Sequence, residues 1–269
     1  MYSNAVRVRG LLVRGMLAGL IAGLIAFAFG YVAGEPSVDA SIAVEEAQAA
    51  ADRGGHHGAA AAPAEEEEEE VVSRAAQSTS GLATGLVVYG VALGGIASLA
   101  FAFAFRRIGG FGPRATAAFT AAGVFTTVFL VPFLKYPATP PAVGNPDTIG
   151  SRTTLFFLMI LLSVLVGLGA VIAGRRLAPR LGNWNASVLA GAGYVLVMAV
   201  LFAVLPDNED AVKASFPAAV LWEFRLASIG LQTVLWATFG LVFGALTERL
   251  LTPRPTPTPD PDPARAAAA

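Results

Sequence analysis

The sequence has no cysteine, and it has only two histidines and two lysines among its 269 residues. Without cysteine there is no disulfide framework, no thiolate metal site and no thiol nucleophile. Neither Lys135 nor Lys213 follows a glycine-rich turn, so no phosphate-binding Walker A loop is present. The patterns HExxH and GxSxG are also missing, as is any His/Cys metal spacing. We therefore expect a protein that is not an enzyme.

Charge is scarce as well, because only 14% of the residues are charged and 55% are hydrophobic. Soluble domains carry about 25% charged residues, and a membrane helix needs about 20 mainly apolar residues. Six stretches meet that length: 11–33, 81–105, 115–133, 155–173, 186–205 and 226–246. They contain no Lys, Asp or Glu, and their one arginine is Arg14. Since they show no two-residue alternation, the sequence predicts an all-α integral membrane protein with a six-helix transmembrane bundle.

The few charged residues are sorted between alternate connections. The basic connections hold Arg7, Arg9, Arg14, Arg106, Arg107, Arg114, Arg175, Arg176, Arg180, Arg249 and Arg254. The acidic ones hold Glu35, Asp39, Glu45, Glu46, Asp52, the run 65–70, Asp147, Asp207, Glu209, Asp210 and Glu223. Because basic connections stay in the cytoplasm, we expect a multi-pass protein of the cytoplasmic (inner) membrane, with both termini inside and the acidic loops outside.

Four segments follow from this topology. They are a basic N-terminus with the first span (1–33), an outer acidic loop (34–80), a five-span bundle (81–251) and a Pro-rich cytoplasmic tail expected to be disordered (252–269). The first span can also be interpreted as a signal peptide, which would leave five spans. Its apolar stretch is longer than the usual h-region of about 7–15 residues, and this favours retention.

Glycines recur at four-residue spacing in three of the spans. The sets are Gly15, Gly19 and Gly23; Gly81 and Gly85; Gly90 and Gly94; and Gly240 and Gly244. In lipid, such faces let helix backbones approach closely. The pattern is typical of tight packing within a bundle, and an exposed glycine face would also suit a helix of a partner protein.

The outer acidic loop contains both histidines of the chain, His56 and His57, in the stretch GGHHG, followed by six glutamates. Imidazole and carboxylate together suit divalent cobalt, nickel and zinc, and the glutamates raise the local cation concentration. The alternative is a solvated acidic loop whose histidines have no role. A separate repeat places Arg74, Arg152 and Arg225 at the predicted outer ends of three spans. These arginines would snorkel, pair with nearby acids or bind an anion.

Four longer blocks of sequence point to a family. They are GEPSVDASIAVEEAQAA, QSTSGLATGLVVYGVALGG, VPFLKYPATPPAVGNPDTIGSRT and LWEFRLASIGLQTVLWATFGLVFGALTERL. Together with the histidine loop they span residues 34–250, and they resemble the CbtA family of cobalt transporter subunits. The chain departs from its relatives in having two histidines where they often carry longer histidine tracts.

The resemblance implies a membrane subunit of a divalent-metal uptake system, with cobalt as the transported ion and a link to cobalamin synthesis. It implies a small one-span, histidine-rich partner (CbtB-like) in the lipid bilayer. It implies no stably bound cofactor and no binding of nucleic acid, and it leaves open whether the chain forms a homo-oligomer. The alternative is a structural or accessory membrane protein that organises a partner and conducts nothing.

Within these blocks we expect oxygen ligands and supporting residues at the outer mouth. Glu35 and Asp39 share a helical face if the first helix continues, and with Glu223 they suit a divalent cation. The remaining candidates are Asp147 as a further metal ligand, Gln77 and Gln232 as further oxygen donors, and Tyr136 and Asn145 in the proline-stiffened loop that also holds Asp147. We expect Arg152 and Arg225 to pair with Asp147 and Glu223. Helix capping or loop anchoring would also explain each residue.

Overall fold

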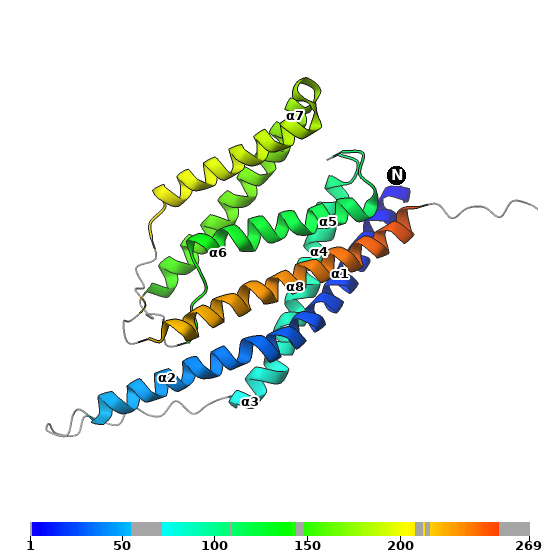
Figure 1. Cartoon of the computed structure of the whole chain (residues 1–269). Coiled ribbons are helices and arrows are strands. Elements are labelled where there is room, and N and C mark those ends of the chain that lie inside the picture. Colours follow the sequence, from blue (N-terminus) through cyan, green and yellow to red (C-terminus); the bar gives the residue numbers. More distant parts are fainter. Residues whose placement is uncertain are drawn as a thin grey trace, which may run out of the picture.

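The computed structural model describes residues 2–54, 72–107, 109–141, 143, 148–207, 212 and 216–252. Within these ranges the chain forms helices and no strand. Five helical stretches are long and apolar enough to cross a membrane. The predicted all-α membrane fold is therefore confirmed. Figure 1 shows long helices lying side by side, with a helical hairpin at one edge.

The first span does not end where the acidic residues begin. Helix α1 (Tyr2–Phe29) passes through a π-helical segment, η1 (Gly30–Gly34), into α2 (Glu35–Gly54). At 1.5 Å per residue this stretch is about 80 Å long, whereas the hydrocarbon core of a bilayer is about 30 Å thick. Residues 35–54, expected as part of a loop, are therefore a helix that extends beyond the bundle (Figure 1).

The second span follows an equivalent course in the opposite direction. A short helix, α3 (Arg74–Ala76), leads through a second π-helical segment, η2 (Gln77–Gly81), into α4 (Leu82–Ala104). The Ser73 side chain caps α3 by accepting a hydrogen bond from the Ala76 backbone N–H. Single π-helical turns within helices often occur at functional sites. Both η1 and η2 lie where their helices enter the segments that hold Glu35, Asp39 and Arg74.

Glycines hold α1 and α4 together. A Cβ atom added to Gly15 would lie 2.5 Å from the Gly94 carbonyl oxygen, and one added to Gly23 would lie 2.5 Å from the Leu86 carbonyl oxygen. A Cβ added to Gly19 would overlap the carbonyl oxygen of Gly90. The two backbones are thus in direct contact, and the glycines that serve this internal packing are Gly15, Gly19 and Gly23 of α1 with Gly90 and Gly94 of α4.

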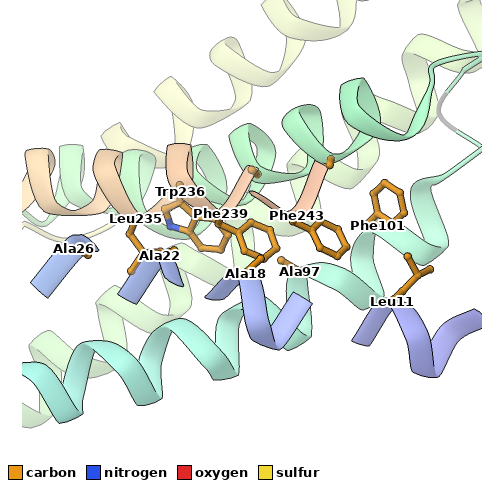
Figure 2. Packing of buried hydrophobic residues seen from close by; sticks show 12 residues of the cluster. Leu11, Ala18, Ala22, Ala26, Ala97, Phe101, Leu235, Trp236, Phe239 and Phe243 are labelled. Carbon is orange, nitrogen blue, oxygen red and sulfur yellow. The ribbon is translucent and has the colours of Figure 1, made fainter. Parts of the chain in front are cut away.

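Large side chains from α8 (Ala218–Leu251) fill the space beside this contact. Figure 2 shows Trp236, Phe239 and Phe243 of α8 lying over the alanines of α1, with Phe101 of α4 at one end. Phe101 and Phe243 meet edge to face at 5.1 Å between ring centroids, an arrangement favoured for aromatic pairs. The core thus combines small residues on α1 with large residues on α8.

The third span consists of α5 (Pro113–Val124), a π-helical segment η3 (Phe125–Leu130) and α6 (Val131–Lys135). Pro113 begins α5, where its fixed φ and missing N–H are favourable. Helix α5 packs along α8, and α6 packs against α7.

Helix α7 (Ile149–Val204) folds back on itself. Its 56 residues are interrupted at Gly182, where φ is 75° and ψ is 160°, a backbone conformation that glycine adopts without steric cost. The two arms lie side by side in Figure 1, in the green-yellow and yellow part of the chain, and Ser163 and Tyr194 share a hydrogen bond of 2.8 Å between them. The predicted fourth and fifth spans are these two arms. The count of six spans stays a prediction, which requires each arm to cross the membrane.

The arginine-rich connections gather at one end of the molecule. Figure 1 places the N-terminus, the α4–α5 turn, the tip of the α7 hairpin and the end of α8 together there. An ion pair of 2.6 Å between Arg114 and Glu248 joins the start of α5 to the end of α8 at this end. Helices α2 and α3 and the start of α8 lie at the opposite end. Which end faces the cytoplasm stays a prediction.

Candidate ion entrance at the acidic end of the bundle

The central feature of the acidic end is an ion cluster that joins α2 to α3. Arg74 on α3 donates from Nη2 and Nε to Asp39 Oδ1, at 2.8 and 3.0 Å, and from Nη2 to Glu35. The side chains of Arg74, Glu35 and Asp39 are 30%, 13% and 63% exposed. Because α2 continues α1 as a helix, the four-residue spacing places both carboxylates on one face. The expectation that they share a face is confirmed.

The proline-rich loop between α6 and α7 lies against α2 and α8. Ser41 on α2 is fully buried and donates to the Pro141 carbonyl oxygen. Arg225 on α8 donates from Nε to the Ala138 carbonyl oxygen at 3.4 Å. Both side chains bind backbone carbonyls within residues 136–141, so this part of the loop is held between α2 and α8.

The base of this loop is also fixed to the segment that follows α7. The Tyr136 hydroxyl donates to the Pro206 carbonyl oxygen at 2.8 Å, and Lys135 forms an ion pair with Asp207. Burial raises the pKa of Tyr136, the Lys135 ammonium lowers it and Asp207 raises it, with a net increase. Tyr136 therefore stays a protonated donor at neutral pH. Its predicted role at an ion entrance stays a prediction.

Of the two pairings expected from the sequence, the one between Glu223 and Arg225 is not formed, and the one between Asp147 and Arg152 stays a prediction. Glu223 is exposed, and it forms no ion pair with Arg225 within the part of the chain that the structure describes. The two residues are two positions apart on α8, about 200° around the helix, so their side chains point to opposite sides. Arg152 lies in the first turn of α7 and has an interaction within the chain. Its expected partner Asp147 lies outside the described residues.

The two glutamines expected as further oxygen donors, Gln77 and Gln232, contact different parts of the structure. Gln77 in η2 donates to the Val72 carbonyl oxygen at 2.9 Å, which anchors the start of α3. Gln232 in α8 faces Tyr89 of α4 instead, with 3.4 Å between its Nε2 and the tyrosine hydroxyl. It lines an open cavity of about 410 Å³ between these helices. His56, His57 and Asn145 lie outside the described residues, so their roles stay predictions.

Sequence reasoning gave no role to Ser41, Lys135 or Tyr89. The Lys135 side chain is only 8% exposed although its partner Asp207 is 94% exposed. One signal could have found Lys135, namely that it is one of only two lysines in the chain and stands in a long family block. Ser41 and Tyr89 also stand in such blocks, but scarcity of the residue type does not single them out as it does Lys135.

Among the residues that the structure describes, no three His, Asp or Glu side chains lie close enough to hold a metal ion together. Glu35 and Asp39 supply two carboxylates, and a third ligand would have to come from water or from another part of the chain.

The model of the family described as "Probable cobalt transporter subunit (CbtA)" matches residues 8–248. The chain belongs to the CbtA family. Neither a search of curated proteins nor a search of solved structures found a match. Membership in CbtA and the five membrane-length helices together make the chain a multi-pass membrane protein of a cobalt transport system. The word "subunit" implies that a CbtA protein works in a complex.

Proposed function

We propose that this chain is the membrane subunit through which cobalt, as a divalent cation, enters the cell across the inner membrane. The observation that carries the proposal is the ion cluster of Glu35, Asp39 and Arg74, at the end of the bundle remote from the arginine-rich turns. A cation that enters a helical bundle must exchange water for fixed oxygen ligands near the membrane surface. Carboxylates are oxygen ligands that divalent cations accept.

In this proposal Arg74 holds the two carboxylates in position while no metal is present. The guanidinium neutralises Glu35, whose side chain is mostly buried and would otherwise hold an uncompensated charge. An arriving divalent cation competes with Arg74 for the carboxylates. The binding energy is therefore partly spent on displacing the arginine, which keeps affinity modest and lets the ion move on.

The histidine and glutamate segment would gather cations above this cluster. His56 and His57 follow α2 in the chain, and the glutamate run 65–70 precedes Arg74 by a few residues. Both are therefore attached to the two elements that carry the ion cluster. A field of negative charge raises the local cation concentration and the rate of encounter, but it does not by itself form a path.

A one-span, histidine-rich membrane protein of the CbtB type is the proposed partner. No stably bound cofactor is part of the proposal, and the metal is the transported substrate. The second candidate function is that of an accessory subunit that organises its partner and conducts nothing. It is favoured by the absence of Asp, Glu and Lys from all six predicted spans, since ion pathways through membranes usually contain such residues.

The test replaces Glu35 with glutamine and measures cobalt uptake by cells that carry the full transport system. Because the amide keeps the size and removes the charge, we expect uptake at limiting cobalt to fall by about tenfold or more, equivalent to about 1.4 kcal/mol. Glu45→Gln is the matched control, since Glu45 lies on the same helix and is exposed. Equal uptake by the two variants would contradict the proposed entrance.

A further inference from the structure

The α7 hairpin and the third span are in contact near the acidic end of the molecule and separate toward the arginine-rich end. Helix α7 packs against η3 and α6, where a Cβ atom added to Gly167 would lie 3.0 Å from Thr127 Cγ2. One turn closer to the arginine-rich end, a Cβ atom at Gly123 of α5 would meet nothing within 4 Å, and Val171 of α7 is 41% exposed. Figure 1 shows the hairpin diverging from α5 in this direction. The two elements therefore form a wedge-shaped opening that widens toward the arginine-rich end.

The wall of this opening on α5 is apolar and faces away from α8. Ala121 packs on α8, since a Cβ atom at Gly240 would lie 3.1 Å from the Ala121 Cβ atom. Gly123 is two positions further along, about 200° around the helix, and so lies on the opposite side of α5. Phe119, one turn before Gly123, is 57% exposed. In a membrane this wall must be covered by hydrocarbon or by another apolar element.

Arginines stand on both rims of the wide end. On α7, Arg175 lies one turn beyond Val171 and is exposed. On the other rim, Phe111 of the α4–α5 turn packs against Phe119, with 5.0 Å between the ring centroids, so this turn lies beside the α5 wall. Arg107 stands in the same turn and is also exposed. The opening thus has apolar walls and a basic mouth.

Neither Arg107 nor Arg175 forms an ion pair within the part of the chain that the structure describes. Arg107 donates from Nη1 to the Phe103 carbonyl oxygen at 2.8 Å, which leaves other N–H groups of its guanidinium for a ligand. The only acidic residue that the described ranges place at this end is Glu248, and it is paired with Arg114. Guanidinium groups suit phosphate because they bind two of its oxygens at once. The mouth therefore suits a phosphate-bearing anion.

We propose that the opening between α5 and α7 binds one anionic phospholipid from the leaflet at the arginine-rich end. Its acyl chains would lie against Phe119, Gly123 and Val171, and its headgroup phosphate would bind Arg107 and Arg175 on the two rims. The site is separate from the proposed cobalt entrance, which lies at the opposite end of the bundle.

Other occupants fit the opening less well. A helix with its side chains is about 10 Å across along its whole length, whereas this opening narrows to a contact between Thr127 and Gly167. Acyl chains are flexible and can fill a wedge, and a phospholipid places its phosphate at the membrane surface, where basic side chains attract it. Free phosphate would bind the arginines but would leave the apolar walls uncovered.

The experiment reconstitutes the purified full chain into vesicles of equal amounts of phosphatidylglycerol and phosphatidylcholine. The chain is then extracted in mild detergent, and the lipids that it retains are counted by native mass spectrometry. We expect wild type to retain phosphatidylglycerol over phosphatidylcholine, and Arg175→Gln to reduce this preference by about fivefold, the attraction that one arginine contributes. Arg249→Gln is the matched control, since Arg249 is exposed at the same end but lies on α8; it should leave the preference unchanged.

A second variant tests the apolar part of the site. Gly123→Leu keeps every charge and fills the narrow part of the opening, so we expect a loss of retained lipid of both kinds. Retention equal to that of wild type would show that the lipid does not enter the opening.

Three further outcomes would overturn the proposal. Equal retention of the two lipids by wild type would mean that the arginines do not select an anionic headgroup. Equal loss of preference in Arg175→Gln and Arg249→Gln would show a general attraction to the basic end and no site. Because the chain has no cysteine, Gly123→Cys provides a single site for crosslinking in native membranes, and a crosslink to a second copy or to a one-span protein would assign the opening to a protein helix.

Discussion

Replacing Arg74 with glutamine separates the structural role of the ion cluster from the cation-binding role of its carboxylates. The substitution removes three hydrogen bonds, two to Asp39 and one to Glu35. Exposed ion pairs contribute about 0–1 kcal/mol, and leaving one partner of a buried pair unpaired costs about 3–5 kcal/mol. Asp39 is 63% exposed and Glu35 only 13%. Because Arg74 itself is 30% exposed, its pair with Glu35 lies between these two limits, and we expect the free energy of unfolding to fall by about 1–3 kcal/mol.

Cobalt should reverse this loss. In the variant, Glu35 and Asp39 no longer have a competing guanidinium, so a divalent cation binds them more tightly than in the wild type. A ligand at one hundred times its Kd stabilises the folded state by about 2.7 kcal/mol, which is comparable to the expected loss. The assay is thermal unfolding of the purified chain in detergent, recorded with and without cobalt, for wild type and Arg74→Gln.

The control combines Arg74→Gln with Glu35→Gln and Asp39→Asn, which removes the carboxylates as well as the arginine. We expect cobalt to raise the unfolding temperature of Arg74→Gln more than that of wild type, and to have little effect on the triple variant. If cobalt stabilises Arg74→Gln no more than it stabilises the triple variant, the two carboxylates do not bind the cation.

Two further predictions concern other parts of the chain. Gly19→Leu should prevent α1 and α4 from meeting, because its Cβ would overlap the backbone carbonyl of Gly90; a single folded species in size-exclusion chromatography, as expected for Gly123→Leu, would refute this. Replacing His56 and His57 with alanine should change uptake by less than about threefold at saturating cobalt and by more when cobalt is scarce, because a charged segment acts through local concentration. Complete loss of uptake at every cobalt concentration would show that this segment is a required site.

The long apolar helices could be found from sequence because lipid imposes a strict length and polarity on each crossing helix, while the count of six spans stays a prediction. The continuation of α1 through Gly30–Gly34 into α2 could not. Two glycines and a run of polar and acidic residues read as a loop, and only the contacts of Ser41 with the proline loop and of Arg74 with Glu35 show what stabilises the helix there.

The partners of individual side chains could also be predicted only in part from the sequence. Periodicity correctly placed Glu35 and Asp39 on one face, but it could not identify Arg74, 35 residues further along than Asp39, as their partner. It also could not tell which glycine sets are covered. A repeat defines a helical face, whereas the helix that packs on that face is decided by the arrangement of the whole bundle.

The most direct test of the central claim is cobalt uptake by sealed vesicles that contain the purified chain, measured with and without the one-span partner. The account predicts that cobalt accumulates in vesicles that contain this chain, that the partner increases the rate, and that Glu35→Gln reduces it. Vesicles with the partner alone should take up no more cobalt than empty ones. Equal uptake by vesicles with the partner alone and by vesicles with both proteins would contradict the account and leave this chain as an accessory subunit.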